Sequence, residues 1–240
     1  MYFTQRAVGR ALLVLAVGAM LGTAHAAPPE PSARFKAECE SKLPPARIVV
    51  TSQPSEVVYD FSRGVQELTK RSGHKDTLQT TLGLTESKFQ LESQWKGEML
   101  QDSMTRQLCT RPQIEITVKV GPQRVSIGKE FPQQSCAFWE IAKHELRHVT
   151  ANQERVEFVA EEMQKELRKS FGNRVFYGSR EDLSRAFSTA LREQWLPWGK
   201  ALYERVADVH REIDSPQEYA RNRTMCDGEV VVVLAKHRNW

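Results

Sequence analysis

The chain has 240 residues, of which 40% are hydrophobic and 27% are charged, with 34 Lys and Arg against 30 Asp and Glu. This composition is that of an ordinary globular protein and excludes a disordered chain, a collagen and a polytopic membrane protein. The net positive charge is small, and the sequence has no run of five or more like charges. The charge pattern therefore does not predict a nucleic-acid-binding protein.

The first 26 residues have the pattern of a secretory signal peptide. Arg6 and Arg10 precede an uncharged apolar run over residues 11–22, and the small-residue pattern Ala-His-Ala follows at positions 24–26. The apolar run is too short to cross a bilayer, which needs about 20 residues. We therefore expect cleavage before Ala27 and a secreted or periplasmic bacterial protein without a stable membrane anchor.

After cleavage, residues 27–34 form a proline-rich leader that we expect to be flexible, and residues 35–240 are expected to form a single domain. One short helix is predicted over residues 63–71, before Gly73. The strand-like segments are residues 46–52, 56–60, 88–96, 113–120 and 124–127. The turn residues Gly121-Pro122-Gln123 predict a β-hairpin between the last two of them.

From Ser135 the spacing of apolar residues changes to the 3.6-residue period of a helix. Ser135 is its expected N-cap, and the helix should run to about Ser170, before Gly172. Strands first and helices afterwards indicate an α+β fold. The remaining predicted elements are helices over residues 181–194 and 198–213 and a strand over residues 229–234.

Residues 144–148 read His-Glu-Leu-Arg-His, an HExxH motif on the long helix. His144 and His148 are one turn apart, about 6 Å along the axis, so both imidazoles can reach one ion. Zinc suits this pair because neutral imidazoles bind it, and three protein ligands leave a fourth position for water. Glu145 lies where its carboxylate can take the proton of a zinc-bound water. Two satisfied or solvated helix histidines without a metal are the plainer alternative.

The third zinc ligand is expected to be His210, since the other mature histidines outside the motif lie in a loop or in the extreme tail. Asp208 and Glu204, on the same predicted helix, remain alternatives. Glu154 has the spacing of the third ligand in the pattern HExxHxxGxxH, but the glycine of that pattern is absent. In a continuous helix Glu154 would lie on another face, about 9 Å beyond the motif.

Four cysteines in an exported chain, without any CxxC spacing, predict two disulfides. Cys109 comes just before a predicted strand and Cys136 opens the motif helix, so we favour a Cys109–Cys136 bridge that clamps the hairpin to the helix. Cys39 and Cys226 would then join the two ends of the chain. The other two pairings remain open.

The segments VVYDFSRGVQEL and WEIAKHELRHV, with the helix that carries the downstream histidine, resemble a bacterial family of secreted zinc-dependent proteases catalogued as a domain of unknown function. The resemblance spans most of the mature chain. It implies a zincin-like fold with His144, Glu145 and His148 in the active site. In zincins an edge strand beside the motif helix receives the substrate in extended form, so one strand of the predicted hairpin should be that edge.

The expected function is therefore that of an exported zinc metallopeptidase, which hydrolyses a polypeptide substrate with a zinc-bound water activated by Glu145. The alternative is a noncatalytic periplasmic or cell-surface binding module whose zinc is structural or absent. A zinc hydrolase of cell-wall material is a third interpretation. Three protein ligands with an open position would favour hydrolysis, and four protein ligands would favour a structural role.

Overall fold

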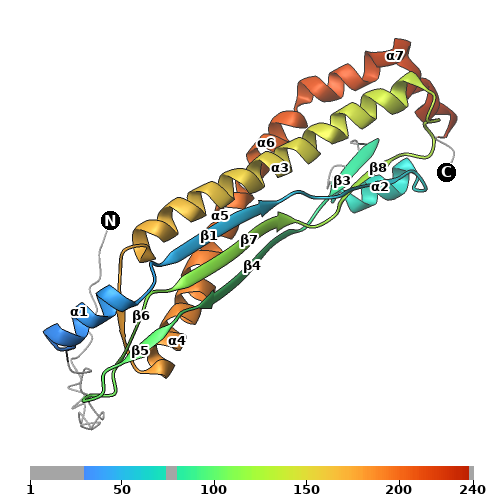
Figure 1. The fold of residues 1–240 in the computed structure, drawn as a ribbon. Helices are drawn as coiled ribbons and strands as arrows, with labels where there is room; N and C mark the ends of the chain where they lie inside the picture. The colour runs from blue at the N-terminus through green and yellow to red at the C-terminus, as the bar shows by residue number, and fades with distance from the viewer. Residues whose placement is uncertain (1–29, 74–79, 238–240) are drawn as a thin grey trace, which may run out of the picture. The chain divides into compact units, whose positions relative to one another are not determined.

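The computed structural model describes residues 30–73 and 80–237 (Figure 1). The predicted signal peptide, residues 1–26, and the first three residues of the expected leader lie outside these ranges. Helix α1 (Ala33–Lys42) begins inside the leader, because the Ser32 hydroxyl accepts a hydrogen bond from the Phe35 N–H at 3.2 Å and caps the helix. Residues 33 and 34 of the expected leader therefore belong to this helix.

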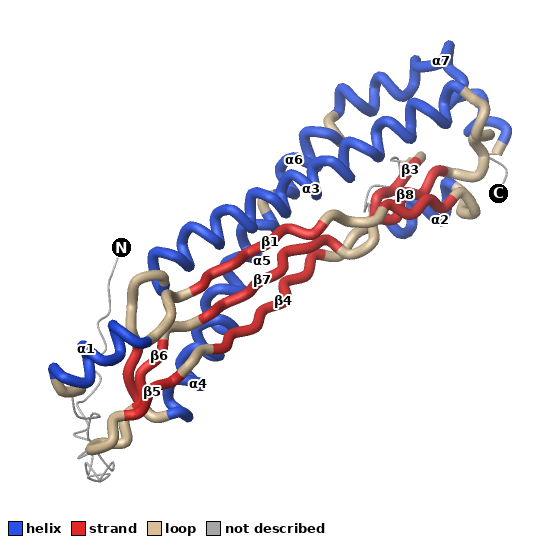
Figure 2. Tube along the Cα trace, viewed as in Figure 1, coloured by secondary structure: helices blue, strands red, loops and turns tan. Residues whose placement is uncertain are grey.

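Two three-stranded sheets occupy the first half of the described chain, and helices fill most of the second half (Figure 2). This arrangement confirms the predicted α+β class. In each sheet the middle strand is parallel to one neighbour and antiparallel to the other. The first sheet has the order β1 (Arg47–Gln53), β7 (Gln113–Val120), β4 (Phe89–Lys96), and the second β2 (Val57–Asp60), β8 (Gln123–Ile127), β3 (Gly83–Glu86).

The predicted hairpin between residues 113–120 and 124–127 is wrong. Strands β7 and β8 are the middle strands of different sheets and do not pair with each other. Pro122 has no N–H for a ladder, so the pairing is interrupted there. The chain does not reverse, because Gly121 donates its N–H to the residue before β4 and Gln123 donates its N–H to the residue before β2. Hydrogen bonds on both sides of Pro122 thus hold the chain extended, and it passes from β7 in the first sheet to β8 in the second.

The long helix α3 (Cys136–Phe171) follows its prediction closely. The Ser135 hydroxyl accepts a hydrogen bond from the Phe138 N–H at 3.1 Å, and Gly172 is the C-cap. The helix packs along β1 and β7 of the first sheet and β8 and β3 of the second. Strand β7 faces it with alternate buried residues, as its sequence pattern predicts. The core between them includes Ile114, Ile116, Val118, Val156, Val159, Met163 and Leu167.

Several short elements were not predicted, because segments of three or four residues carry too little periodicity to recognise. Helix α2 (Val65–Arg71) confirms the predicted short helix but begins after Gly64. A small third sheet, in the order β5-β6-β9, packs near α1. The unpredicted strands are β3, already described, and β5 (Met99–Gln101), β6 (Leu108–Thr110) and β9 (Phe176–Gly178).

The predicted helices at residues 181–194 and 198–213 are confirmed in broad terms, with a π-helical stretch and a break inside them. The observed elements are α4 (Arg180–Thr189), η1 (Ala190–Trp195), α5 (Leu196–Glu204), α6 (Val206–Ile213) and α7 (Pro216–Lys236). The predicted strand at residues 229–234 is wrong, since it forms the last part of α7 after a kink at residues 225–228. One face of this helix carries Val230, Val233 and Leu234, which belong to the same hydrophobic cluster. Their burial in that cluster outweighs the preference of valine for strands.

The disulfides join Cys39 to Cys109 and Cys136 to Cys226, so the predicted pairing is wrong. Helix α1 packs on the small third sheet, which brings Cys39 to Cys109 in strand β6. The kink in α7 brings Cys226 to the first residue of α3. Both bridges therefore depend on how helices dock, and sequence order alone does not reveal this.

Removal of the bridge between α3 and α7 should destabilise the protein strongly. Because Cys136 and Cys226 are 90 residues apart, replacing both with serine should lower the free energy of unfolding by about 4 kcal/mol. Urea unfolding of the variant beside the wild type measures the difference. Non-reducing peptide mapping provides the control, and a peptide linking Cys39 to Cys226 would contradict the observed pairing.

Across residues 30–73 and 80–237, no helix combines the length and the apolar character that a membrane crossing requires.

Candidate metal centre

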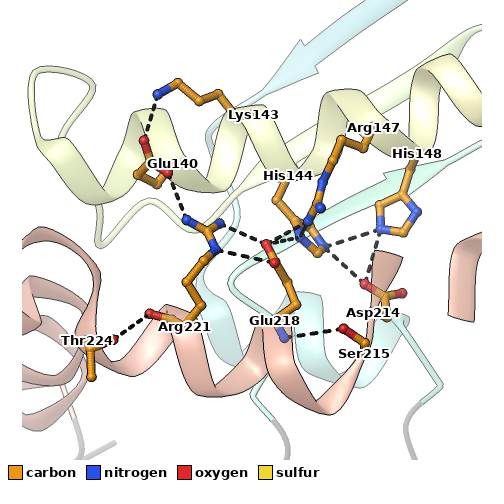
Figure 3. A network of polar contacts seen from close by, with 10 residues as sticks. All are labelled: Glu140, Lys143, His144, Arg147, His148, Asp214, Ser215, Glu218, Arg221 and Thr224. Carbon is orange, nitrogen blue, oxygen red and sulfur yellow. Dashed lines mark hydrogen bonds and ion pairs between the residues drawn. The ribbon is translucent and has the colours of Figure 1, made fainter. Parts of the chain in front are cut away.

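The two motif histidines converge with the carboxylate of Asp214 (Figure 3). The Nε2 atoms of His144 and His148 lie 3.3 Å apart. The Oδ1 atom of Asp214 lies 3.0 Å from His144 Nε2 and 3.2 Å from His148 Nε2. Three ligand-type atoms, two from α3 and one from the turn between α6 and α7, thus form a nearly equilateral triangle.

This triangle has the dimensions of one face of a tetrahedral zinc site. With metal bonds of about 2.0–2.1 Å, tetrahedral ligand atoms lie about 3.3–3.4 Å apart. Two imidazole nitrogens and a carboxylate oxygen are also common zinc ligands, and they leave the fourth position open. The residues present therefore fit the ion. Cys136, Cys226 and Glu229 form a second cluster of metal-ligating residue types, but its sulfurs are joined in a disulfide.

Asp214 reaches α3 because the chain turns sharply between two helices. Helix α6 ends where the Asp214 N–H donates to the His210 carbonyl oxygen at 2.9 Å. Ser215 starts the next helix, as its hydroxyl accepts a hydrogen bond from the Glu218 N–H at 3.3 Å. Pro216 occupies the first turn of α7, where a missing N–H costs nothing. The sequence Asp-Ser-Pro thus fixes the position of the carboxylate.

His210, the predicted third ligand, lies beside His148 but outside the triangle. Its Nδ1 atom is 2.9 Å from His148 Nδ1, the ring nitrogen that faces away from Asp214. Burial lowers the pKa of His210 below its ordinary value, and the neighbouring His148 acts in the same direction. Asp214, and not His210, thus completes the triangle with the two motif histidines.

The other candidates for the third ligand lie away from the triangle. Glu204 and Asp208 are exposed and pair with basic residues of their own helices, Lys200 and Arg211. Glu154 is also exposed and lines a separate surface hollow between α3 and α6. None of the three belongs to a metal-ligating cluster of the described residues.

Glu145 is buried between α3 and the edge strand β3, with only 4% of its surface exposed. The Thr85 hydroxyl donates a hydrogen bond to Glu145 Oε2 at 2.7 Å. Gly83, on the same face of β3, permits this close approach, since a Cβ atom there would lie 2.6 Å from Glu145 Oε1. Burial raises the pKa of Glu145 above its ordinary value, while the charge of His148 and the Thr85 hydrogen bond oppose the shift. A carboxylate with a raised pKa accepts a proton more readily, as a general base requires.

A carboxylate from α7 supports the other side of His144. Glu218 Oε1 lies 3.1 Å from His144 Nδ1 and accepts hydrogen bonds from Arg147 at 2.6 Å and Arg221 at 2.8 Å (Figure 3). The hydrogen bond from Arg221 lowers the pKa of Glu218 to about 2, with the hydrogen bond to His144 and the charge of Arg147 adding to the effect. Glu218 is thus ionised at neutral pH, and the His144 Nδ1 atom that it contacts also lies 2.7 Å from a guanidinium nitrogen of Arg147.

The charges of this cluster favour cation binding. Burial alone lowers the pKa of His144, but the Asp214 hydrogen bond, the charge of Glu145 and the Glu218 hydrogen bond outweigh it and leave this pKa above its ordinary value. Burial alone raises the pKa of Asp214, but hydrogen bonds from His144 and His148 hold it well below its ordinary range. The carboxylates of Asp214 and Glu218 beside the two histidines would likewise stabilise a bound dication.

A cavity of about 190 Å³ opens over the triangle. Its walls come from the segment that leads into β3, from α3 and from the first turns of α7. Tyr219 of α7 lines it, and burial raises the pKa of this phenol, with the charges of Asp214 and Glu145 adding to the effect. The phenol therefore keeps its proton and remains a hydrogen-bond donor in the cavity.

Sequence reasoning missed four residues that surround the motif histidines or Glu145: Asp214, Glu218, Tyr219 and Thr85. The first three belong to the segment DSPQEY, and Asp-Ser-Pro is a recognisable helix-start signal that could have indicated a turn beside His210. Thr85 carried no such signal, because its strand has only four residues and its role depends on docking against α3.

No known protein family matches the chain, and neither the curated proteins nor the solved structures give a significant match.

Proposed function

We propose that this protein is an exported zinc-dependent metallopeptidase with a zincin-like fold. The observation that carries the proposal is the triangle of His144, His148 and Asp214, with the buried Glu145 next to it and a cavity above it. Three protein ligands with an open fourth position are typical of catalytic zinc sites. The signal-like N-terminus and two disulfides support an oxidising location outside the cytoplasm.

The chain's own residues supply the proton transfers and the orientation of the reactants. A zinc ion held by His144, His148 and Asp214 would polarise the scissile carbonyl and make a water molecule more acidic. Glu145 takes the proton of the attacking water and passes it to the leaving amine. The hydrogen bond from Thr85 fixes the Glu145 carboxylate, so its basic oxygen stays at the cavity during the reaction.

The substrate strand is proposed to pair with β3. The hairpin strands that were predicted for this role are excluded, since β7 and β8 are both interior. Among the described strands β3 pairs only with β8, and it lines the cavity. Leu82 accepts a hydrogen bond from Gly128 across the sheet, so the alternation of an antiparallel ladder turns the backbone groups of Gly83 and Thr85 toward the open edge. An extended peptide can pair there irrespective of its sequence, which favours a polypeptide substrate.

Methylation of single backbone nitrogens in a cleaved peptide should locate this pairing. Each methyl group that removes a hydrogen bond to β3 should lower kcat/KM by about two- to twelvefold, because one such bond contributes about 0.5–1.5 kcal/mol. Methylation at the alternate positions, whose N–H groups face away from β3, is the matched control. Equal tolerance of methylation at all positions would exclude strand addition at β3.

The direct test of the proposal is zinc content and peptide hydrolysis of the mature protein. We expect about one zinc per chain and cleavage of an unfolded casein substrate that stops when a chelator removes the metal. Zinc without cleavage would favour the binding module, and cleavage confined to cell-wall material would favour the hydrolase of another polymer.

A further inference from the structure

A chain of polar side chains continues from His148 into the protein interior. His210 Nδ1 lies 2.9 Å from His148 Nδ1, and His210 Nε2 lies 3.1 Å from the side-chain oxygen of Asn152. The side-chain amide of Asn152 in turn donates to Gln123 Oε1 at 2.9 Å. Asn152 and Gln123 are buried, with 2% and 0% of their surfaces exposed. These groups play no part in the proton transfers described above.

The donor and acceptor of each hydrogen bond in this series of side chains can be assigned by starting at its buried end, Gln123. Gln123 Nε2 lies 3.5 Å from the backbone carbonyl oxygen of Val149, which can only accept a hydrogen bond, so the Gln123 oxygen faces Asn152. Asn152 therefore presents its amide nitrogen to Gln123 and its oxygen to His210. The Tyr203 hydroxyl also donates to this oxygen, at 2.8 Å. A flipped pair of amides would place two carbonyl oxygens face to face, at Gln123 and Val149.

These directions determine the tautomers of the two histidines. Since His210 Nε2 faces an oxygen, it carries the proton, and the lone pair of the neutral ring is at Nδ1. That lone pair accepts a hydrogen bond from His148, so the proton of His148 is at its own Nδ1. Nε2 is therefore the nitrogen of His148 whose lone pair a metal ion could take, and in the structure this atom makes the hydrogen bond to Asp214.

We propose that His210 is a positioning residue, which holds His148 in the Nδ1-protonated tautomer and thereby directs the Nε2 lone pair of His148 to the metal. This inference rests on the proposed function, because it assigns the metal to the triangle of His144, His148 and Asp214. It gives His210 a role different from that of a ligand. Asn152 and Gln123, buried in the core, fix which ring nitrogen of His210 carries the proton.

Replacing His210 with phenylalanine removes the acceptor and keeps a ring of similar size. Zinc affinity, measured by chelator competition, should fall ten- to a hundredfold, as is usual when the hydrogen-bond partner of a metal-ligating histidine is lost. Replacing His210 with asparagine keeps an oxygen close to the position of Nδ1 and should restore most of that affinity. Glu212→Gln, an exposed change on the same helix, is the matched control and should leave zinc affinity at the wild-type value.

Nitrogen-15 NMR of the zinc-loaded protein with labelled histidine gives a second readout. His148 should be protonated at Nδ1 and metal-bound at Nε2, while neither nitrogen of His210 is metal-bound. A metal-bound His210, or equal zinc affinity in the phenylalanine variant and the wild type, would overturn the inference and leave the proposed function intact. Failure of the wild type to bind zinc would instead reject the proposed function, and this inference with it.

Discussion

Replacing Glu145 with glutamine should retain zinc and fold while lowering peptide hydrolysis by about two orders of magnitude or more, the effect of losing a positioned general base. Glutamine keeps the shape and can still pair with the Thr85 hydroxyl, but it has no basic oxygen. Because Glu145 is buried beside the triangle and is not one of its corners, zinc content should stay near one per chain. Zinc analysis, thermal melting and casein cleavage on both proteins measure the three quantities.

Glu154→Gln is the matched control for this variant. Glu154 lies on the same helix and is exposed away from the cavity, so its replacement should alter neither zinc content nor cleavage. Equal cleavage by the Glu145→Gln protein and the wild type would remove Glu145 from the mechanism. Loss of zinc from the Glu145→Gln protein would instead indicate that Glu145 acts in metal binding.

The parts of the fold that sequence predicted correctly are those with local signals. Helix α3 begins at the Ser135 cap and ends at Gly172 because capping and glycine act within a few residues. The break at Pro122 was also recognised, but whether the chain reverses there depends on partners far away in sequence. The hairpin and the disulfide pairing therefore failed for one reason, since both depend on tertiary docking.

The candidate site shows the same division. His144 and His148 could be paired from sequence because one helical turn separates them. His210 and Asp214 are also one turn apart, so the sequence pointed to the right segment of the chain, although Asp214 was not among the residues predicted as the third ligand. What distinguishes them is the end of α6: Asp214 lies in the turn and faces the Nε2 atoms, while His210, still within the helix, meets the opposite nitrogen of His148.

Replacing Asp214 with alanine should cause the largest loss of zinc affinity among these variants. A zinc site with several ligands binds its ion with about 10–16 kcal/mol, so each ligand contributes several kcal/mol and its loss should weaken binding by about a thousandfold or more. The effect should clearly exceed that of His210→Phe, because Asp214 lies at a corner of the triangle, whereas His210 contacts only the outer nitrogen of His148. Hydrolysis should be lost together with the zinc.

Asp208→Ala is the matched control, since Asp208 is an exposed aspartate of the same helix–turn segment that pairs with Arg211. Chelator competition on the three variants and the wild type should give affinities in the order wild type, Asp208→Ala, His210→Phe, Asp214→Ala, with the first two equal. The cobalt-substituted protein adds a spectroscopic test, because His210→Phe should keep the ligand-field bands of the wild type and Asp214→Ala should shift them. The reverse result, with zinc retained in Asp214→Ala and lost in His210→Phe, would identify His210 as the third ligand and reduce Asp214 to a hydrogen-bond partner of the two motif histidines.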